Sequence, residues 1–305
     1  MKVLVTGVGG QLGYDVINEL INRGHTAIGT DVVGRENLNV YDLNSPAATA
    51  SYVKLDITDK SSVKAVFDVE KPDAVVHCAA WTAVDAAEEA DNIPKVRKIN
   101  VDGTRHIVES CQELGCKMVY LSTDYVFDGQ GTEPWHPDCK MYSPLSVYGQ
   151  SKLDGELIVS NELEKYFIVR IAWVFGVNGN NFVKTMLKLG KKYDTLRVVY
   201  DQVGTPTYTF DLARLLVDMI ESDKYGYYHA TNEGGYISWY DFACEIFKQA
   251  GYTTKVIPVT TEEYGVSKAQ RPFNSRLDKS KLALNGFSPL ASWQDALDRY
   301  LHFQI

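Results

Sequence analysis

Residues 2–13 read Lys2-Val3-Leu4-Val5-Thr6-Gly7-Val8-Gly9-Gly10-Gln11-Leu12-Gly13, an apolar run followed at once by a glycine-rich turn. The β-branched run predicts a buried strand, and apolar residues three and four apart in Leu12–Ile21 predict a helix after the turn. Gly7, Gly10 and Gly13 permit a tight turn, close approach of a pyrophosphate and close packing of the helix. The helix N-terminus then offers free amides to phosphate groups. We therefore predict a dinucleotide-binding turn, against the alternative of a glycine-rich turn without a ligand.

The same alternation of strand and helix continues outward from this turn. Further strands are predicted at Thr26–Thr30, Tyr52–Leu55, Ala74–His77, Met118–Ser122, Phe167–Ile171 and Leu196–Val199. Strands that alternate with helices form a parallel sheet with right-handed crossovers and helices on both faces. The predicted fold class is therefore α/β, a Rossmann-type doubly wound parallel sheet with a smaller C-terminal substrate-binding lobe. The sheet domain is expected to comprise residues 1–172 and about 196–230, and the lobe residues 173–195 and 231–305.

The composition is that of an ordinary globular protein, with 305 residues of which 45% are hydrophobic and 23% charged. The net charge of −8 argues against the broad basic surface that nucleic-acid binding requires. The apolar runs are shorter than the roughly 18 to 20 residues that span a bilayer, and the start lacks the features of a signal peptide. The five cysteines, Cys78, Cys111, Cys116, Cys139 and Cys244, show no CxxC spacing. We therefore expect reduced thiols, no metal site and a cytoplasmic protein.

Polar and small residues follow the predicted strands at the edge where open α/β sheets bind ligands. Asp31 ends the second strand, where a carboxylate accepts hydrogen bonds from adenine-ribose hydroxyls and repels a 2′-phosphate, unless it is merely a strand-end cap. NADH is therefore favoured over NADPH, although Arg35 offers a charge that can pair with such a phosphate. The predicted cofactor-binding residues are Gly7, Gly9, Gly10, Gln11, Leu12, Asp31, Asp56, Ile57, Ala79 and Ala80, together with Tyr148 and Lys152.

A tyrosine and a lysine with helical spacing are the candidate catalytic pair. Ser143-Pro144 has the form of a helix start, and Tyr148-Gly149-Gln150-Ser151-Lys152 follows it. Positions i and i+4 share a helix face, so the phenol and the ammonium group point into one site. We expect the lysine charge, together with the positive charge of an oxidised nicotinamide, to lower the tyrosine pKa from its usual value of about 10. The phenol then serves as a general acid toward a carbonyl oxygen.

Two further side chains complete the candidate catalytic set. Thr123 ends the fifth strand, and its hydroxyl is expected to hydrogen-bond the same carbonyl oxygen. Asn100 falls within a predicted helix, where its amide either holds a water that relays protons to Lys152 or is an ordinary satisfied helix residue. The Tyr-x-x-x-Lys pattern is common by chance, so its weight comes from the strand-end hydroxyl and the glycine turn that accompany it.

These motifs together resemble the extended short-chain dehydrogenase/reductases, and within them the dTDP-4-dehydrorhamnose reductase family. The resemblance extends over nearly the whole chain and rests on Gly10-Gln11-Leu12-Gly13 and on residues 80–88 (AWTAVDAAE), 122–129 (STDYVFDG), 143–149 (SPLSVYG), 170–176 (RIAWVFG), 180–183 (NNFV) and 271–278 (RPFNSRLD). It implies NADH- or NADPH-dependent reduction of the C4 ketone of a dTDP-6-deoxy-4-ketohexose. In that reaction Tyr148 donates the proton, Lys152 lowers its pKa and Thr123 binds the carbonyl.

The resemblance also implies a nucleotide-sugar pocket built from both parts of the chain. The substrate-binding residues that it implies are Thr82, Val84, Asp85, Thr123, Asp124, Tyr125, Trp173, Asn181, Phe182, Arg271 and Asn274. An arginine fork suits a diphosphate and aromatic rings suit a thymine face. Most of these positions have an alternative role in packing the smaller lobe. The resemblance also allows a homodimer.

Three features depart from the family pattern. Position 81 is Trp81, where a smaller or polar residue is common, and the connection over residues 34–51 is longer than usual. The C-terminal segment Trp293–Asp298 lacks the glutamates that bind magnesium at the dimer interface of some members, so magnesium dependence is doubtful.

Two rival functions stay open at this point. A nucleotide-sugar epimerase on the same fold needs the same tyrosine and lysine, whereas a dehydratase is disfavoured because Tyr125 stands where a second acid is expected after Asp124. A non-catalytic dinucleotide-binding subunit, similar to the methionine adenosyltransferase β subunit, is disfavoured because Thr123, Tyr148 and Lys152 are all present.

Overall fold

The computed structural model describes residues 1–38, 40, 42–265 and 267–304. Its strands are β1 (Lys2–Thr6), β2 (Thr26–Asp31), β3 (Ser51–Lys54), β4 (Ala74–His77), β5 (Lys117–Thr123), β6 (Tyr166–Ile171), β7 (Val174–Phe175), β8 (Thr195–Val199), β9 (Val203–Gly204), β10 (Thr207–Tyr208), β11 (Gly226–His229), β12 (Ile237–Ser238) and β13 (Lys255–Val259). Its α-helices are α1 (Gln11–Asn22), α2 (Pro46–Thr49), α3 (Lys60–Glu70), α4 (Val84–Ala87), α5 (Ile93–Arg97), α6 (Thr104–Leu114), α7 (Val147–Glu162), α8 (Phe182–Gly190), α9 (Thr209–Ile220), α10 (Trp239–Gln249), α11 (Thr261–Tyr264), α12 (Ser280–Leu284) and α13 (Trp293–Gln304). A π-helical segment, Lys98–Gly103, and two short 3₁₀ segments, Arg35–Asn37 and Asp124–Val126, complete the described elements.

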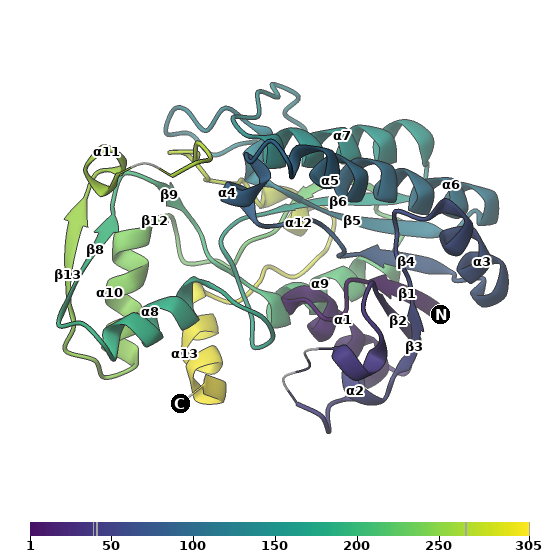
Figure 1. Ribbon diagram of the computed structural model, residues 1–305, viewed down its shortest axis with the longest axis horizontal. Helices are drawn as coiled ribbons and strands as arrows, with labels where there is room; N and C mark the ends of the chain where they lie inside the picture. The colour runs from purple at the N-terminus through teal and green to yellow at the C-terminus, as the bar shows by residue number, and fades with distance from the viewer. Residues whose placement is uncertain (39, 41, 266, 305) are drawn as a thin grey trace.

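Seven parallel strands form the central sheet in the order β11-β6-β5-β4-β1-β2-β3. The order runs outward from β1 in both directions, which is the doubly wound arrangement. All four residues of β4 are buried, because helices cover both faces of a parallel sheet. The predicted α/β class with a Rossmann-type sheet is confirmed (Figure 1).

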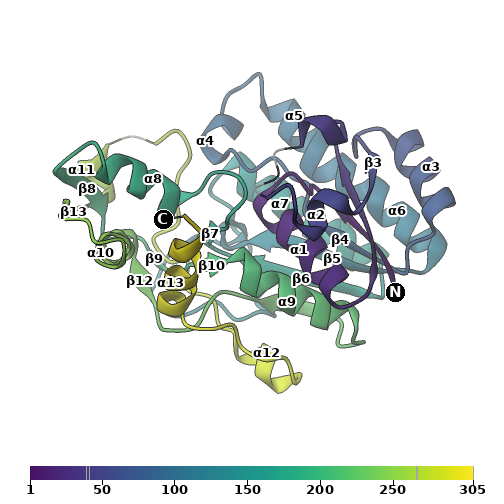
Figure 2. The ribbon, with the colours of Figure 1, turned by 90° about the horizontal axis from the view of Figure 1, so that it is seen from below.

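The two faces of the sheet carry separate apolar layers. Helices α1 and α9 cover one face, and α3, α6 and α7 cover the other (Figures 1 and 2). Neighbouring residues of β1 belong to different layers, with Val3 and Val5 in the first and Leu4 in the second, as the period of two along a strand requires. The core thus fixes which way each strand faces, and it brings the carboxyl ends of the strands to one edge.

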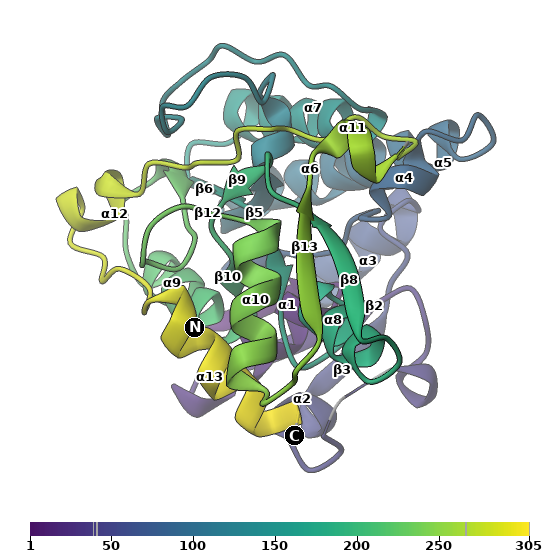
Figure 3. The same cartoon turned by 90° about the vertical axis from the view of Figure 1, so that its left-hand side faces the viewer.

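The smaller lobe has its own sheet and helices. Strands β8 and β13 pair in parallel from Thr195 and Lys255 onward, and α8 and α10 pack together beside them (Figure 3). The prediction that Leu196–Val199 extends the central sheet is therefore wrong. The seventh strand of that sheet is instead β11, which pairs with β6. Strand β8 exposes Thr195 and Arg197, as a strand with one solvated face does.

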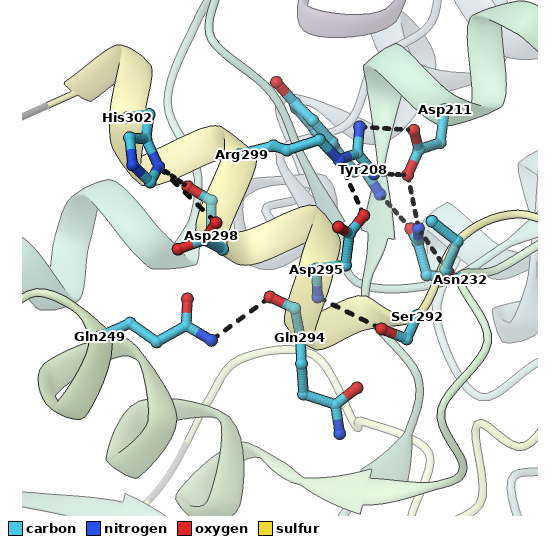
Figure 4. Close-up of polar contacts among 11 residues, drawn as sticks. Tyr208, Asp211, Asn232, Gln249, Ser292, Gln294, Asp295, Asp298, Arg299 and His302 are labelled. Atoms are coloured by element: carbon cyan, nitrogen blue, oxygen red, sulfur yellow. Dashed lines mark hydrogen bonds and ion pairs between the residues drawn. The ribbon is translucent and has the colours of Figure 1, made fainter.

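An arginine connects helix α13 of the lobe to helix α9 of the sheet domain (Figure 4). The two guanidinium nitrogens Nη1 and Nη2 of Arg299 donate to the two carboxylate oxygens of Asp211, at 2.8 and 2.7 Å. Asp211 also accepts a hydrogen bond from the side-chain amide of Asn232 at 2.8 Å, and Asp295 binds Arg299 Nε at 2.8 Å. A bidentate pair of this kind fixes orientation as well as contact. Within the described part of the chain, no helix is long and apolar enough to cross a bilayer.

A buried carboxyl group on α1 makes the stability of the protein depend on pH. Asp15 is 5% exposed, and Thr209 Oγ1 donates a hydrogen bond to it. Burial raises the pKa of Asp15 to about 7. The folded protein therefore holds a proton that the unfolded chain releases near pH 4, so the carboxyl group costs stability as pH rises from about 4 to 7. We expect Asp15→Asn to be more stable than the parent at pH 8, by roughly 4 kcal/mol at most.

Urea unfolding at pH 5 and pH 8 measures this difference. The advantage of Asp15→Asn is expected to be larger at pH 8, whereas Asp102→Asn, at an exposed position, serves as the control with no such dependence. An equal advantage of Asp15→Asn at both pH values would show that ionisation of Asp15 does not oppose folding.

Candidate active site

A cleft of about 710 Å³ runs along the carboxyl edge of the central sheet. Its lining includes most residues that the sequence nominated: Gly7, Gly10, Gln11, Leu12, Asp31, Asp56, Ile57, Ala79, Ala80, Thr82, Val84, Thr123, Asp124, Tyr125, Tyr148, Lys152 and Trp173. Most of the predicted cofactor and catalytic residues therefore share one cavity, because the carboxyl ends of parallel strands meet at a single edge, whereas Gly9 and Asn100 lie outside its lining.

The glycine turn fits the backbone of a dinucleotide. Gly7 has φ of +73°, and a Cβ atom there would lie 2.7 Å from the backbone nitrogen of Ala79. A Cβ atom on Gly13 would collide with the backbone of Gly7, so glycine lets α1 start directly against the strand. The N-cap of α1 is Gly10, which has no side chain to occupy the first helical amides, and these are therefore available to a phosphate.

Acidic charge lies at the end of β2. The carboxylate of Asp31 accepts hydrogen bonds from the backbone amides of Gly9 at 3.0 Å and Val32 at 2.8 Å. Arg35 donates to the carbonyl oxygen of Ala48 at 2.9 Å and lies 5.7 Å from the Tyr52 ring centroid. Asp31 therefore lines the cleft, whereas the guanidinium group of Arg35 is engaged by the connection to β3. Positions 39 and 41 of that connection lie outside the described residues.

Helix α7 carries the candidate catalytic pair, Tyr148 and Lys152. Its N-cap is Ser146, whose hydroxyl accepts a hydrogen bond from the amide of Gly149 at 3.1 Å. The prediction of a helix start at Ser143 is wrong, because the amide of Ser143 donates to the carbonyl of Val126 and the chain is still a loop there. Tyr148 consequently lies in the first turn of the helix, near the loop that follows β5.

A hydrogen-bonded chain lies beside the phenol in the cleft. Thr123, which lines the cleft with Tyr148, donates its hydroxyl to Asp124 Oδ1 at 2.9 Å. Asp124 is 2% exposed and accepts a further hydrogen bond from Ser275, which belongs to the lobe. Burial raises the pKa of Asp124 to about 6. The Tyr125 ring meets the Tyr148 ring edge-on, with centroids 5.6 Å apart.

Burial shifts the pKa values of both members of the pair. Withdrawal from water raises the pKa of Tyr148 above its usual value, and Asp124 adds to the rise. Burial also lowers the pKa of Lys152 to about 7, against an opposing effect of Glu156. Burial therefore outweighs the charge of Lys152, which is only partly protonated near pH 7, and a lowering of the Tyr148 pKa by Lys152 together with an oxidised nicotinamide stays a prediction. A raised pKa keeps the proton on the phenol, which is the form that a general acid requires.

Asn100 has partners other than the predicted water. It lies in the π-helical segment Lys98–Gly103, and its side-chain oxygen accepts from the amide of Trp81 at 2.7 Å. Its side-chain nitrogen donates to the carbonyl of Trp81 at 3.2 Å and to Ser151 Oγ at 2.9 Å. Both donor hydrogens are therefore used, so the structure gives Asn100 the role of holding the loop after β4 against α7.

Trp173 forms a strained wall of the cleft. Its φ is +53°, a left-handed conformation that a residue with a bulky side chain rarely adopts. Its indole stacks on Trp239 with centroids 3.7 Å apart and planes 15° apart. Backbone strain of this kind persists where the surrounding structure imposes it, and it is frequent at functional sites. Trp239, which the sequence did not nominate, provides the stacking surface.

An ion pair joins the two lobes at the side of the cleft. Arg271 Nη2 lies 2.6 Å from the carboxylate of Asp85, and Arg271 Nη1 donates to the hydroxyl of Tyr125 at 3.3 Å. The other oxygen of Asp85 accepts from the amide of Ala269 at 3.1 Å. Asp85 and Arg271 thus lie outside the lining of the cleft, but they reach it through Tyr125.

Three residues that were predicted to contact the substrate have contacts within the protein. Asn181 caps α8 and donates to the carbonyl of Gly176 at 2.8 Å, and Phe182 packs against Trp239 with centroids 4.6 Å apart. Asn274 is 1% exposed, and its side-chain amide donates to the carbonyls of Gln130 and Glu133. Helix capping, lobe packing and loop fixation thus engage the three side chains, and their contact with a substrate stays a prediction.

The sequence missed several cleft residues. Ser122 is buried in the lining, and its hydroxyl has no hydrogen-bond partner among the described residues, so a polar ligand group would satisfy it. Lys95 and Lys98 bring positive charge to the same cavity. A strand-end Ser-Thr pair was visible in the sequence, but no pattern separated these lysines from surface lysines. In the described ranges, no cluster of His, Cys, Asp or Glu is arranged to hold a metal ion.

The doubly wound sheet, the glycine turn and the Tyr/Lys pair in one cleft define an extended short-chain dehydrogenase/reductase. The chain belongs to the RmlD substrate binding domain family, whose model matches residues 1–304. The spore coat polysaccharide biosynthesis protein SpsK of Bacillus subtilis is 39% identical, over 98% of this chain and 96% of the relative. A dTDP-4-dehydrorhamnose reductase of Aggregatibacter actinomycetemcomitans is 36% identical, over 97% of each.

Solved structures agree with these relatives. A dTDP-4-dehydrorhamnose reductase from Clostridium acetobutylicum, 41% identical, superposes with a TM-score of 0.89 over 100% of this chain and 99% of its own. A dTDP-4-dehydrorhamnose reductase from Bacillus anthracis, solved in complex with NADP, is 38% identical and has a TM-score of 0.86, over 99% and 98% of the two chains.

Proposed function

We propose that this chain is an NAD(P)H-dependent oxidoreductase that reduces the C4 ketone of a dTDP-6-deoxy-4-ketohexose, dTDP-4-dehydrorhamnose, to give dTDP-L-rhamnose. The observation that carries the proposal is the convergence of Thr123, Tyr148 and Lys152 in the cleft that the glycine turn also lines. Two similar proteins that are named dTDP-4-dehydrorhamnose reductase support this choice of substrate.

A bound dinucleotide would supply the hydride for this reaction. Residues at the turn and strand ends would hold it: the amides at the start of α1 would bind the pyrophosphate, Asp31 would accept from ribose, and the unpartnered hydroxyl of Ser122 would offer a polar contact. Tyr148 donates its proton to the ketone oxygen as the carbon is reduced, and Thr123 would donate to that oxygen after turning its hydroxyl away from Asp124. Lys152 keeps positive charge beside the phenolate that is left.

The sugar lies between the two lobes in this proposal. Thr82, Val84, Asp124, Tyr125 and Trp173 line its part of the cleft. Asp85 and Arg271 act at the side, where the arginine can meet the diphosphate. The division of the chain at residue 172 into a cofactor part and a substrate part belongs to the same proposal.

The simplest experiment distinguishes a reductase from an epimerase on the same fold. Purified protein is mixed with NADH and dTDP-4-dehydrorhamnose. The loss of NADH is measured from its absorbance, and the amount of reduced sugar is measured in the same samples. We expect NADH loss in equal amount to the alcohol formed. Conversion of the sugar with no net loss of NADH would identify an epimerase instead. A panel of other nucleotide-linked 4-ketosugars then fixes the base and the sugar.

Asp31 is expected to set the choice between NADH and NADPH. Its carboxylate repels the extra phosphate of NADPH, while Arg35 is engaged by Ala48. Replacement by serine removes the repulsion, so Asp31→Ser should raise kcat/KM for NADPH by about tenfold or more relative to NADH. Asp56→Ser, at a neighbouring strand end, is the matched control with an unchanged ratio. If the parent enzyme already prefers NADPH, and Asp31→Ser leaves that ratio unaltered, then Asp31 does not select the cofactor.

The remaining assignments are also proposals. We infer that the enzyme works in the cytoplasm, where nucleotide sugars and NAD(P)H are present, and that it is active without magnesium. A homodimer is the proposed assembly. Turnover that persists after treatment with a chelator would support activity without magnesium. The mass of the protein in solution tests the homodimer.

A further inference from the structure

A buried tyrosine of β5 lies directly under the catalytic lysine. Tyr120 is 0% exposed, and the centroid of its ring is 4.1 Å from Lys152 Nζ. Its hydroxyl donates a hydrogen bond to the backbone carbonyl of Lys152 at 3.1 Å. A Cβ atom on Gly155 would collide with this hydroxyl, so the glycine permits the close approach. One side chain therefore contacts both ends of the same lysine.

The ring of Tyr120 is itself held in place. It stacks on His77 with centroids 6.0 Å apart and planes 27° apart. His77 Nδ1 hydrogen-bonds Thr6 at 2.8 Å, and Nε2 hydrogen-bonds Thr104 at 3.3 Å. Burial lowers the pKa of His77 to about 3, so this imidazole is neutral and does not compete as a cation for the ring. The surface beneath the lysine is fixed by strands β1, β4 and β5 and by the start of α6.

We propose that Tyr120 is a positioning residue for Lys152, in which the ring face holds the ammonium group at the floor of the cleft and the hydroxyl fixes the backbone of the same lysine. A cation over the centre of an aromatic face is attracted by the ring quadrupole, and the attraction is strongest when the pair is withdrawn from water. The inference rests on the proposed function only in that Lys152 serves Tyr148.

The titratable groups around Lys152 include one carboxylate, and that carboxylate is already paired. On its own helix, Glu156 lies one turn further and is bound through two hydrogen bonds to Arg170 of β6, both at 2.8 Å, so much of its charge is neutralised. On β4 and the loop after it, His77 and the thiol of Cys78 are neutral, since burial raises the pKa of Cys78 to about 12. Tyr148, on the same helix, also keeps its proton. Glu156 also favours the ammonium form, and the aromatic face, 4.1 Å from Nζ, adds a second attraction directly beneath the charge.

Direct titration of Lys152 tests the inference without sugar or dinucleotide. The intact protein is treated with acetic anhydride across a pH series, and acetylation of Lys152 is followed by peptide mass spectrometry. The neutral amine attacks the anhydride, so labelling reports loss of the proton. In Tyr120→Leu the ring face is gone, and we expect the labelling midpoint to fall by about one pH unit or more. In Tyr120→Phe the face remains, and the midpoint should stay at its original value.

A graded series separates the electrostatic role from a packing role. Phenylalanine analogues with one, two and three ring fluorines keep the shape of the ring but weaken its quadrupole, so the midpoint should fall with each added fluorine. This series tests the electrostatic role of the ring even if Tyr120→Leu fails to fold. A midpoint that does not move across the series overturns the proposal, as does an equal shift in Tyr120→Phe.

The activity profile gives an independent readout. In a plot of kcat against pH, the fall in kcat at high pH should begin at lower pH in the fluorinated series. The KM for the sugar should stay almost unchanged. If the labelling midpoint moves but no ketone is reduced by the parent protein, the proposed function fails while the role of Tyr120 stands. If ketone is reduced and the midpoint stays constant, the role of Tyr120 fails alone.

Discussion

Tyr148→Phe is expected to lower kcat for ketone reduction by about 100- to 10,000-fold, with almost unchanged affinity for NADH. The substitution removes the one oxygen that donates the proton, and it leaves the ring in its edge-on contact with Tyr125. It also leaves the glycine turn and Asp31 in place, so the dinucleotide still binds. Steady-state kinetics give the first quantity, and a fluorescence titration with NADH gives the second.

The matched control is another buried phenol away from the cleft. Tyr228 of β11 is 1% exposed and donates its hydroxyl to the carbonyl of Lys224. Tyr228→Phe should therefore turn over ketone at the parent rate. Undiminished turnover in Tyr148→Phe would remove the general-acid assignment. Undetectable turnover in the parent protein, with normal NADH binding, would favour a regulatory subunit over an enzyme.

Arg170→Met is expected to destabilise the fold by about 3 to 5 kcal/mol. Arg170 and Glu156 are both 0% exposed and form two parallel hydrogen bonds. Arg170 also donates to the carbonyl of Pro137 at 3.0 Å and to Tyr142 at 3.2 Å. Its removal leaves the carboxylate of Glu156 buried without its partner, which is the main cost. The free energy of unfolding in urea measures the change.

Two comparisons show whether the unpaired charge is responsible. Arg97→Met breaks a pair with Asp154 that is open to water, so its cost should stay below about 1 kcal/mol. The double variant Arg170→Met/Glu156→Leu removes both charges and should lose less stability than Arg170→Met alone. A double variant that is less stable than the single one would show that the hydrogen bonds and packing of the pair, and not the stranded charge, dominate.

The sequence predicted the central sheet because its strands are short, apolar and separated by helical patterns. Six of the predicted strands lie within one or two residues of β1 to β6. β11 was missed because Gly226–His229 contains no β-branched residue, and Leu196–Val199 was misplaced because a β-branched run does not reveal which sheet it joins. Pairing partners far apart in the chain depend on tertiary packing, which local propensity does not encode.

The candidate site was predictable where a residue type follows a strand end. Thr123, Asp31 and the glycines lie in the cleft because topology brings strand ends together. The smaller lobe was harder, since Asn181 and Asn274 are as suited to capping and loop fixation as to a ligand, and only the fold shows which partners they have. The charge states were also hidden, because burial, which raises the pKa of Tyr148, is a property of the folded protein.

Transfer of deuterium from the cofactor tests the central claim most directly. The protein is supplied with NADH carrying deuterium at both C4 positions of the nicotinamide and with dTDP-4-dehydrorhamnose, and the product sugar is examined by mass spectrometry and NMR. We predict one deuterium at C4 of the sugar for each NADH oxidised, and none in Tyr148→Phe over the same time. A product without deuterium at C4, or a sugar that changes while NADH is conserved, would contradict ketone reduction in this cleft.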